Sequence, residues 1–330
     1  MARVAINGLG RIGRATLKII LDQPGFELVA INDLVPADNL AYLLKYDTVY
    51  GRYGKSVESS EDALSVDGKE IRVLNEKDPA QLPWSELGVD AVFECTGLFT
   101  KEEQLKKHLS AGAKHAILSA PAKSPEIATV VHGVNTGEGE QMFSCASCTT
   151  NSITPVVEII GREIGIRKAM LTTIHAYTST QAIVDGPSSK YRRGRAAAAN
   201  LVPSSTGAAV ATTKALPQYE GKFDGVAIRT PVPIGSISDL TFVLEKSTSV
   251  EEVNDLLKKA CETDQYKDVL AVTEDPIVSS DIIGDAHAAI VDLTVTQVVD
   301  GDLLKVMAWY DNEWGYASQM VREARKVLNA

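Results

Sequence analysis

The first half of the chain alternates short apolar runs with amphipathic stretches. The runs RVAIN (3–7) and ELVAIN (27–32) flank a segment with helical periodicity from Gly10 to Asp22. This order predicts a strand–helix–strand unit with parallel strands. The same reading predicts further strands at 89–94, 114–119 and 128–133, a helix at 101–112, and a hairpin that turns at Asp67-Gly68.

Longer apolar runs follow residue 150. A helix is predicted from about Thr149 to Ile164, and later runs include KAMLTTIH, FDGVAIRTPV and SISDLTFVLE. In Ile290–Val298, apolar residues at 291, 293 and 295 alternate with polar ones, which predicts an antiparallel sheet with one covered face. The aperiodic stretch 177–200 holds the basic cluster KYRRGR and predicts a long loop, and helical spacing returns over 315–328.

Length, charge and cysteine count narrow the class of protein. A chain of 330 residues exceeds twice the commonest domain size, so we expect two domains. Its 43 acidic and 33 basic residues give a formal charge of −10, which argues against nucleic acid as a primary partner. Four cysteines in so long a chain fit a reducing compartment, and no run of about 18 apolar residues occurs. We therefore expect a cytoplasmic protein with no membrane partner.

A glycine-rich segment, NGLGRIG (7–13), joins the first predicted strand to the first predicted helix. Gly8, Gly10 and Gly13 follow the G-x-G-x-x-G spacing of dinucleotide-binding turns, although glycine-rich turns also arise for packing alone. Asp33 follows Gly13 by 20 residues at the end of the second strand, where a carboxylate can accept hydrogen bonds from a ribose. Its charge would oppose a 2′-phosphate. The segment therefore predicts a Rossmann domain that binds NAD in preference to NADP.

The stretch SCASCTTNS (144–152) places Cys145 and Cys148 three residues apart. Cys148 falls where a helix is predicted to begin, and a helix N-terminus favours a thiolate. His175, at the end of the strand in LTTIHAYTST, is the candidate base. Two other interpretations of the cysteine pair stay open. A zinc site needs two more ligands, but Cys95 and Cys261 are neither paired nor flanked by histidines, so the site predicted here contains no metal. A thioredoxin-like redox pair is the other interpretation, although such pairs usually lie in a small βαβ domain.

Seven segments, in unbroken order along the chain, resemble the phosphorylating glyceraldehyde-3-phosphate dehydrogenases. They are NGLGRIGR (7–14), INDL (31–34), SAPAK (119–123), ASCTTNSITP (146–155), TTIHAYT (172–178), SSTGAA (204–209) and WYDNEWGY (309–316). The resemblance implies an α/β protein: a Rossmann NAD-binding domain over 1–147, completed by the C-terminal helix at 312–330, plus an α+β catalytic domain over 148–311 with a mostly antiparallel sheet.

The same resemblance implies roles for the polar residues of the second domain. Cys148 would attack the aldehyde of glyceraldehyde 3-phosphate, with His175 moving the proton, to give a hemithioacetal, a thioester and finally 1,3-bisphosphoglycerate. Thr178 and Arg229 would hold the phosphate of the substrate. The attacking phosphate would lie against Ser147, Thr149, Thr206 and Gly207, with Arg193 of the basic loop nearby.

The resemblance also implies the cofactor contacts and a homotetramer. The cofactor residues would be Asn7, Gly8, Gly10, Arg11, Ile12, Gly13, Asp33, Lys77, Ser119 and Asn312. Two departures stand out: Cys145 replaces the usual Asn, which suggests a redox pair with Cys148, and Lys77 replaces a frequent Arg. The alternative functions are an erythrose-4-phosphate dehydrogenase and, outside enzymes, an NAD-binding regulatory module.

Overall fold

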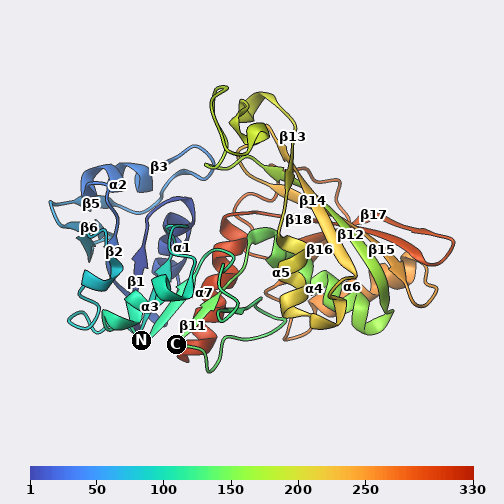
Figure 1. Cartoon of the computed structure of the whole chain (residues 1–330), viewed down its shortest axis with the longest axis horizontal. Coiled ribbons are helices and arrows are strands. Elements are labelled where there is room, and N and C mark those ends of the chain that lie inside the picture. The colour runs from blue at the N-terminus through green and yellow to red at the C-terminus, as the bar shows by residue number, and fades with distance from the viewer. The chain divides into compact units, whose positions relative to one another are not determined.

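The computed structural model describes residues 1–330, and the chain divides into two compact units (Figure 1). The first unit comprises Met1–His132, Thr136–Ala146 and Met320–Ala330, and the second comprises Gly133–Asn135 and Ser147–Gln319. None of the helices combines the length and the apolar character that a bilayer crossing requires.

The first unit is built on a nine-stranded sheet in the order β10-β11-β9-β8-β1-β2-β7-β6-β5. β1 pairs in parallel with both β2 and β8, as the strand–helix–strand pattern predicts. The elements are β1 (Ala2–Asn7), α1 (Arg11–Asp22), β2 (Phe26–Asn32), α2 (Ala37–Lys45), β3 (Tyr46–Asp47), β4 (Gly51–Arg52), β5 (Val57–Ser59), β6 (Ala63–Val66), β7 (Lys69–Leu74), η1 (Pro79–Gln81), β8 (Ala91–Glu94), α3 (Glu102–Ser110), β9 (His115–Leu118), β10 (Ala128–Thr129) and β11 (Met142–Ser144).

Two local predictions for the first unit have different outcomes. The hairpin between β6 and β7 turns at Asp67 and Gly68, whose φ angles of 49° and 76° are those of the tight turn that this dipeptide favours, so that prediction is confirmed. The strand predicted at 128–133 is wrong beyond its first residues. It pairs only through Ala128 and Thr129, because its parallel neighbour β11 ends at Ser144.

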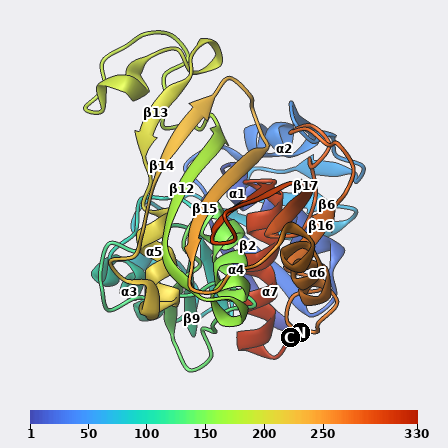
Figure 2. The same ribbon diagram turned by 90° about the vertical axis from the view of Figure 1, so that its right-hand side faces the viewer.

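The second unit is built on a seven-stranded mixed sheet in the order β13-β14-β12-β15-β18-β17-β16. Figure 2 shows β13, β14, β12 and β15 side by side. Four of its six strand pairs are antiparallel, as predicted. The elements are α4 (Cys148–Glu163), β12 (Ile166–Ala176), η2 (Tyr191–Gly194), η3 (Ala197–Ala199), β13 (Val202–Ser205), α5 (Ala208–Ala215), η4 (Pro217–Tyr219), β14 (Phe223–Thr230), β15 (Ser236–Leu244), α6 (Val250–Cys261), β16 (Leu270–Thr273), β17 (Ala289–Val299), β18 (Leu303–Tyr310) and α7 (Trp314–Leu328), which continues into the first unit.

One face of this second sheet carries the core of its unit. In β15, Leu240, Phe242 and Leu244 are fully buried, while the residues between them are half-exposed. Ile153 and Val156 of α4 belong to the same apolar cluster. Since each such side chain contributes about 1.5–3 kcal/mol on burial, this cluster fixes α4 against the sheet.

The predicted alternation in β17 is wrong after its first half. Val291 and Leu293 are buried as expected, but Asp292 is buried too and Thr296 is buried where an outward side chain was expected. The register against β18 shifts between Asp292 and Gln297. Between these two pairs β17 advances five residues (292 to 297) while β18 advances two (307 to 305), and an odd difference moves the following side chains to the opposite face.

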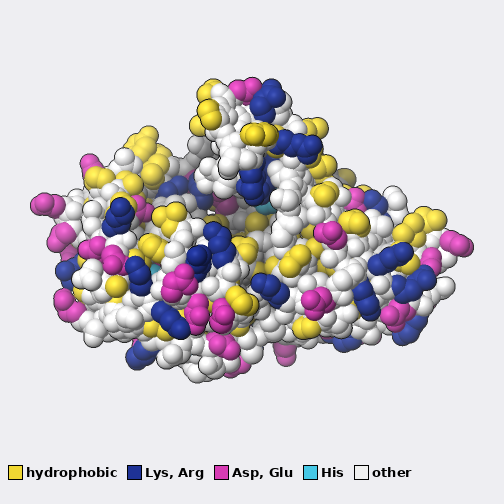
Figure 3. Space-filling view, viewed as in Figure 1, with side chains coloured by type: hydrophobic (Ala, Val, Ile, Leu, Met, Phe, Trp, Pro, Cys, Tyr) yellow, Lys and Arg dark blue, Asp and Glu magenta, His cyan; other side chains and the backbone are white.

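The stretch 177–200 is a long loop that includes the short turns η2 and η3, and basic side chains gather on it (Figure 3). Asp185 braces the loop internally, accepting hydrogen bonds from Arg195 Nε at 2.7 Å and from the Ala196 N–H at 2.9 Å. Arg195 is therefore neutralised within the loop.

Candidate functional site

The glycine-rich turn after β1 has a distinct physical requirement at each glycine. Gly8 has φ +93°, a conformation that side chains rarely adopt. A Cβ at Gly13 would lie 2.0 Å from the carbonyl oxygen of Gly8, so α1 can pass this close only with glycine there. Nothing lies within 4 Å of a Cβ at Gly10, so that position faces open space. The turn therefore leaves room for a ligand beside its backbone.

Helix α1 begins at this open space without a side-chain cap, and Gly10 is its N-cap residue. The N–H groups of Arg11, Ile12 and Gly13 form its first turn, where an anion is favoured. The Arg11 guanidinium forms an ion pair with Asp47. The Arg11 side chain is therefore occupied by Asp47. The backbone N–H of Arg11 is the group of this residue that suits a pyrophosphate.

Asp33 follows β2 and reaches the glycine-rich turn. Its Oδ2 accepts a hydrogen bond from the Leu9 N–H at 2.7 Å, and its Oδ1 accepts one from the Val35 N–H at 3.0 Å. A carboxylate has about four acceptor sites, so this one retains acceptor capacity for ribose hydroxyls.

A buried polar network beneath the turn was not anticipated from the sequence. Glu94, at the end of β8 and fully buried, accepts hydrogen bonds from Asn7 Nδ2 (2.6 Å), from the Thr96 N–H (2.8 Å) and from the Thr96 hydroxyl. His108 Nε2 lies 3.0 Å away, and Trp84 Nε1 donates to His108 Nδ1 at 3.1 Å. Because the indole can only donate, Nε2 carries the imidazole proton and donates to Glu94. The network fixes the side chain of Asn7.

The remaining cofactor candidates lie in different surroundings. Ser119 lies at the end of β9, and its N–H donates to the Glu94 carbonyl at 3.0 Å, so it shares the strand edge with Asn7 and Asp33. Lys77 is exposed in the segment after β7. In the second unit, Asn312 Oδ1 accepts from the Gly235 N–H and from the Ser236 hydroxyl, both at 3.1 Å. These two contacts orient the amide and leave its Nδ2 as a donor.

The first unit fits a dinucleotide on these observations. The open position at Gly10, the uncapped start of α1 and the carboxylate of Asp33 lie at the carboxyl ends of β1 and β2. β1 lies between β2 and β8 in the sheet, which is where the strand order reverses and where such ligands bind in open parallel sheets.

In the second unit, Cys148 and His175 meet. Cys148 is the first residue of α4, and His175 lies near the end of β12, with Sγ and Nε2 3.4 Å apart. Ser147 caps α4 by accepting a hydrogen bond from the Thr150 N–H at 3.1 Å. Ala146 precedes it with φ 55°, a sparsely populated conformation for a residue other than glycine. The reversal at Ala146 delivers the chain into the helix that carries the thiol.

The electrostatics of this pair differ from the sequence expectation. Burial raises the pKa of the Cys148 thiol, although Arg229, the Thr149 hydroxyl and nearby N–H groups act in the opposite direction. Burial and then the charge of Arg229 lower the pKa of His175 to about 3. Both shifts favour the uncharged forms of the pair, so burial opposes the charge that the helix N-terminus favours at Cys148.

Arg229 lies close to this pair, and Arg193 lies near Arg229; neither guanidinium group has a carboxylate partner. Arg229 Nη1 approaches His175 Nδ1 at 2.5 Å, and its Nε is buried without a hydrogen bond. Burial lowers the pKa of Arg229, and the positive charge of Arg193 lowers it further. Arg193 donates to the Thr180 hydroxyl at 3.1 Å, which lies 2.9 Å from the Thr178 hydroxyl. The structure thus brings Thr178, Arg193 and Arg229 into one region of unbalanced positive charge that suits an anion.

Other predicted phosphate ligands already have partners within the unit. Thr149 Oγ1 lies 2.8 Å from the hydroxyl of Tyr310, which lies 2.8 Å from Thr173 Oγ1. Tyr310 is fully buried, and nothing in the sequence singled it out. Thr206 Oγ1 accepts from the Ala208 N–H at 3.2 Å, and Gly207 is the N-cap residue of α5.

None of the four cysteines forms a disulfide, and no group of three His, Cys, Asp or Glu side chains is arranged to hold a metal. Burial raises the pKa of Cys145 well above its usual value, and the nearby carboxylate of Glu323 raises it further. The redox pair of Cys145 with Cys148 stays a prediction. Peptide mapping after mild peroxide tests it, because a Cys145–Cys148 crosslink is the product that it requires.

Comparison with known proteins gives full-length matches. The family profile "Glyceraldehyde 3-phosphate dehydrogenase, NAD binding domain" matches residues 2–102, and the profile for the C-terminal domain of the same family matches residues 147–312. Curated proteins named glyceraldehyde-3-phosphate dehydrogenase include one from Thermotoga maritima, 51% identical over 333 residues (99% of each chain). Another, from Streptomyces coelicolor, is 48% identical over 324 residues, 97% of this chain and 96% of its own.

Proposed function

Because the chain belongs to the glyceraldehyde-3-phosphate dehydrogenase family, we infer that it catalyses the NAD-dependent oxidation and phosphorylation of glyceraldehyde 3-phosphate to 1,3-bisphosphoglycerate. It is an NAD-dependent oxidoreductase. The observation that carries the reaction is the thiol–imidazole pair of Cys148 and His175, 3.4 Å apart beside the unbalanced charge of Arg229.

We assign the nucleophile to Cys148 and the proton shuttle to His175. The Cys148 sulfur forms a bond to the aldehyde carbon as Nε2 of His175 takes the thiol proton, and the resulting hemithioacetal holds the carbon in a tetrahedral state. Nε2 passes this proton to the former aldehyde oxygen and so becomes free to remove it again when the carbon loses its hydride and becomes the thioester carbon. Inorganic phosphate then attacks the thioester carbon, the carbon–sulfur bond breaks to release the acyl phosphate, and the Cys148 thiolate that leaves can recover the proton from Nε2.

NAD supplies the hydride acceptor when it is bound, and the residues proposed to hold it divide by function. The N–H groups of the first turn of α1 suit its pyrophosphate, and Asp33 suits its adenosine ribose. Asn312 offers Nδ2 to the carboxamide, because its Oδ1 is held by Gly235 and Ser236. Asn7, Lys77 and Ser119 complete the proposed set. These assignments imply an NAD-binding part of 1–147 with 312–330, and a catalytic part of 148–311.

Two phosphate sites follow from the reaction. Thr178 and Arg229 are proposed for the phosphate of the substrate, and the absence of a carboxylate on Arg229 supports this. Arg193 is proposed to serve the attacking phosphate, together with Ser147, Thr149, Thr206 and Gly207. The hydroxyls of Ser147, Thr149 and Thr206 already form hydrogen bonds within the protein, so they would have to share their donor and acceptor sites with the anion.

The decisive assay follows NADH formation by the purified protein with glyceraldehyde 3-phosphate, NAD and inorganic phosphate. We expect turnover to require phosphate and to stop on alkylation of Cys148. Turnover that is indifferent to phosphate would instead indicate a thioester hydrolysed by water, as in the erythrose-4-phosphate alternative. NAD binding without any phosphate-dependent NADH formation would indicate the regulatory module.

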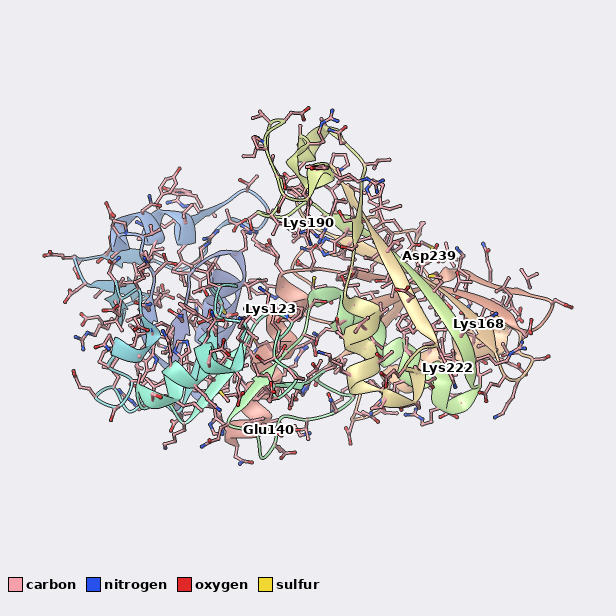
Figure 4. All side chains as sticks on the ribbon, viewed as in Figure 1. Lys123, Glu140, Lys168, Lys190, Lys222 and Asp239 are labelled. Carbon is pink, nitrogen blue, oxygen red and sulfur yellow. The ribbon has the colours of Figure 1, made fainter.

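A homotetramer is proposed on the uncovered face of the second sheet. Met170 and Val226 are 55% and 51% exposed there, and Ile237 and Val243 lie half-exposed on the same face. Figure 4 labels Lys168 and Asp239 on the neighbouring strands β12 and β15. Both charged residues lie on this same face, so its exposed apolar side chains alternate with charged ones. Because exposed apolar side chains that gather on one face often mark a contact with another protein, another copy of the chain is its expected cover. Sedimentation equilibrium tests this, and Val226→Asp should lower the mass of the assembly. We also propose a cytoplasmic location, which cell fractionation tests.

A further inference from the structure

The side-chain amide of Asn312 is held at its oxygen end alone. Its Oδ1 accepts hydrogen bonds from the Gly235 N–H and from the Ser236 hydroxyl, both at 3.1 Å. Its Nδ2 donates to no group of the chain, although the residue is only 6% exposed. Because the Gly235 N–H can only donate, an amide turned over would place two donors against each other. The chain therefore determines that Nδ2 is the atom left for a ligand.

A second contact directs the proton of the Ser236 hydroxyl to Asn312. The Ala176 N–H donates to Ser236 Oγ at 3.2 Å and so occupies a lone pair of that oxygen. The single proton of the hydroxyl is then free for Oδ1 of Asn312. Ser236 and Ala176 are both fully buried, so bulk water does not compete for either contact. Ser236 thus joins the end of β12, next to His175, to the amide of Asn312.

The backbone beside these contacts is fixed, so the side chain of Ser236 decides how firmly the plane of the amide is held. Gly235 has φ +86°, and a Cβ there would lie 2.5 Å from the Ser279 carbonyl oxygen, so only glycine can present this N–H. Asp311 is buried and fixes the chain on the other side, where its Oδ2 accepts from the Gly284 N–H at 2.8 Å. One hydrogen bond to the amide oxygen would leave the amide free to pivot, whereas two fix its plane.

We propose that Ser236 is a positioning residue that determines which face of the nicotinamide ring receives the hydride, because it holds Asn312 with Nδ2 directed at the carbonyl oxygen of the cofactor carboxamide. The hydride leaves the carbon bonded to the Cys148 sulfur and adds with its electron pair to C4 of the ring, so the carbon is oxidised and NAD is reduced. A ring turned by half a rotation about its bond to the ribose presents the opposite face of C4 and moves the carboxamide away from Asn312. The inference rests on the proposed function in one respect, since it takes Asn312 as the ligand of the carboxamide.

Calorimetric titration tests whether Ser236 acts through the carboxamide. The two ligands are NAD and pyridine adenine dinucleotide, the analogue that carries hydrogen in place of the carboxamide. We expect Ser236→Ala to weaken the binding of NAD by about fivefold, the loss of roughly one hydrogen bond, and to leave the affinity for the analogue unchanged. In an Asn312→Ala background, Ser236→Ala should have no further effect on the difference between the two ligands. An equal loss for both ligands, or no loss for NAD, overturns the proposal.

The position of the transferred hydrogen tests the choice of ring face. The enzyme oxidises glyceraldehyde 3-phosphate that carries tritium on the aldehyde carbon, and two dehydrogenases of known and opposite facial specificity then report which position of C4 in NADH is labelled. We expect the wild-type enzyme to label one position and Ser236→Ala to label both. Label confined to one position in the variant, or divided between both positions in the wild type, contradicts the proposal.

Ser238→Ala is the matched control on the same strand. Ser238 lies two residues further along β15 and is fully buried, but its hydroxyl has no hydrogen-bond partner. Binding and labelling should therefore remain as in the wild type, and a change as large as that of Ser236→Ala would overturn the proposal. If NADH forms with phosphate but Ser236→Ala does not separate the two ligands, only this inference fails. If the ligands are separated as expected and no phosphate-dependent NADH forms, the proposed function fails instead.

Discussion

The turn of the first unit and the thiol site of the second treat buried charge in opposite ways. Glu94 receives hydrogen bonds from Asn7, Thr96 and His108, so the chain itself satisfies the carboxylate beneath the turn. In the second unit, Arg229 and Arg193 lie near each other without a carboxylate, and burial lowers the pKa of Arg229. The carboxylate of the first unit has its hydrogen-bond donors within the chain, whereas the two guanidinium groups of the second unit have no carboxylate partner.

This difference follows from what each region has to bind. A preformed turn with its donors fixed loses little freedom when a cofactor binds, which favours affinity. A desolvated guanidinium without a partner is unfavourable in the empty site and becomes favourable when an anion arrives. The second region therefore ties its stability and its chemistry to the substrate.

The largest effect is expected from the two nearby cysteines. Cys148→Ala removes the nucleophile, and we expect kcat to fall by at least about 10⁴-fold while NAD binding persists. Cys145→Ala is the matched control, because that thiol is buried with a strongly raised pKa and should leave kcat within about twofold. Steady-state kinetics and NAD titration measure both. Equal losses in the two variants would contradict the assignment of the nucleophile.

The second-largest loss of activity is expected at His175, the proposed base. His175→Asn should lower kcat by about 10²- to 10⁴-fold, the usual contribution of a positioned base. The variant keeps Cys148, so stoichiometric alkylation of that thiol should still occur, at a slower rate near neutral pH. A kcat within a few-fold of wild type would show that another group, or water, takes the proton.

Sequence reasoning succeeded where chemistry and fold are encoded locally. The spacing of Gly8, Gly10 and Gly13 behind an apolar run was sufficient to predict the strand, the turn and the helix, because each glycine answers a backbone requirement within a few residues. The element order of the first half and the antiparallel pairing in the second follow from similar short-range patterns, but the two parallel pairs of the second sheet do not.

It failed where the partners are far apart along the chain. Asn7 and Glu94 are 87 residues apart, and Arg229 and His175 are 54 apart, so neither contact has a local signature. The register shift in β17 is equally invisible, since an alternating pattern does not reveal the residue at which it reverses. A glutamate at the end of the apolar run VDAVFE was the one available sign of a buried polar network.

Acid should weaken the second unit through His175. The folded protein keeps this imidazole neutral down to a pKa of about 3, whereas the unfolded chain binds the proton below about 6.5. Stability is therefore lost as the pH falls from about 6.5 toward 3, because the unfolded state binds more protons in that window. At pH 5 this residue should contribute a loss of about 2 kcal/mol. Urea unfolding at pH 7 and pH 5 should show a smaller decrease for His175→Asn than for wild type.

A smaller change is expected at the cofactor turn. Asp33→Asn keeps an acceptor for the Leu9 or Val35 N–H but removes the charge. A hydrogen bond to a charged group contributes about 1.5–3 kcal/mol, so the preference for NAD over NADP, measured as a ratio of kcat/KM, should fall by roughly tenfold or more. An unchanged ratio would place the ribose elsewhere. The thiol site should not respond, so alkylation of Cys148 in the absence of cofactor is the control.

The smallest effect separates a structural role from a binding role at Ser147. Ser147 caps α4, and Ser249 caps α6 by accepting from the Glu252 N–H at 3.2 Å. Replacing either serine with alanine should lower the free energy of unfolding by about 1 kcal/mol, because each leaves a helix N–H without its cap. Only Ser147→Ala should also raise the KM for inorganic phosphate, by about fivefold, if its hydroxyl contacts the attacking anion. Equal losses of stability with no change in that KM would leave Ser147 as a cap alone, and the attacking phosphate would then depend on Arg193 and the start of α5.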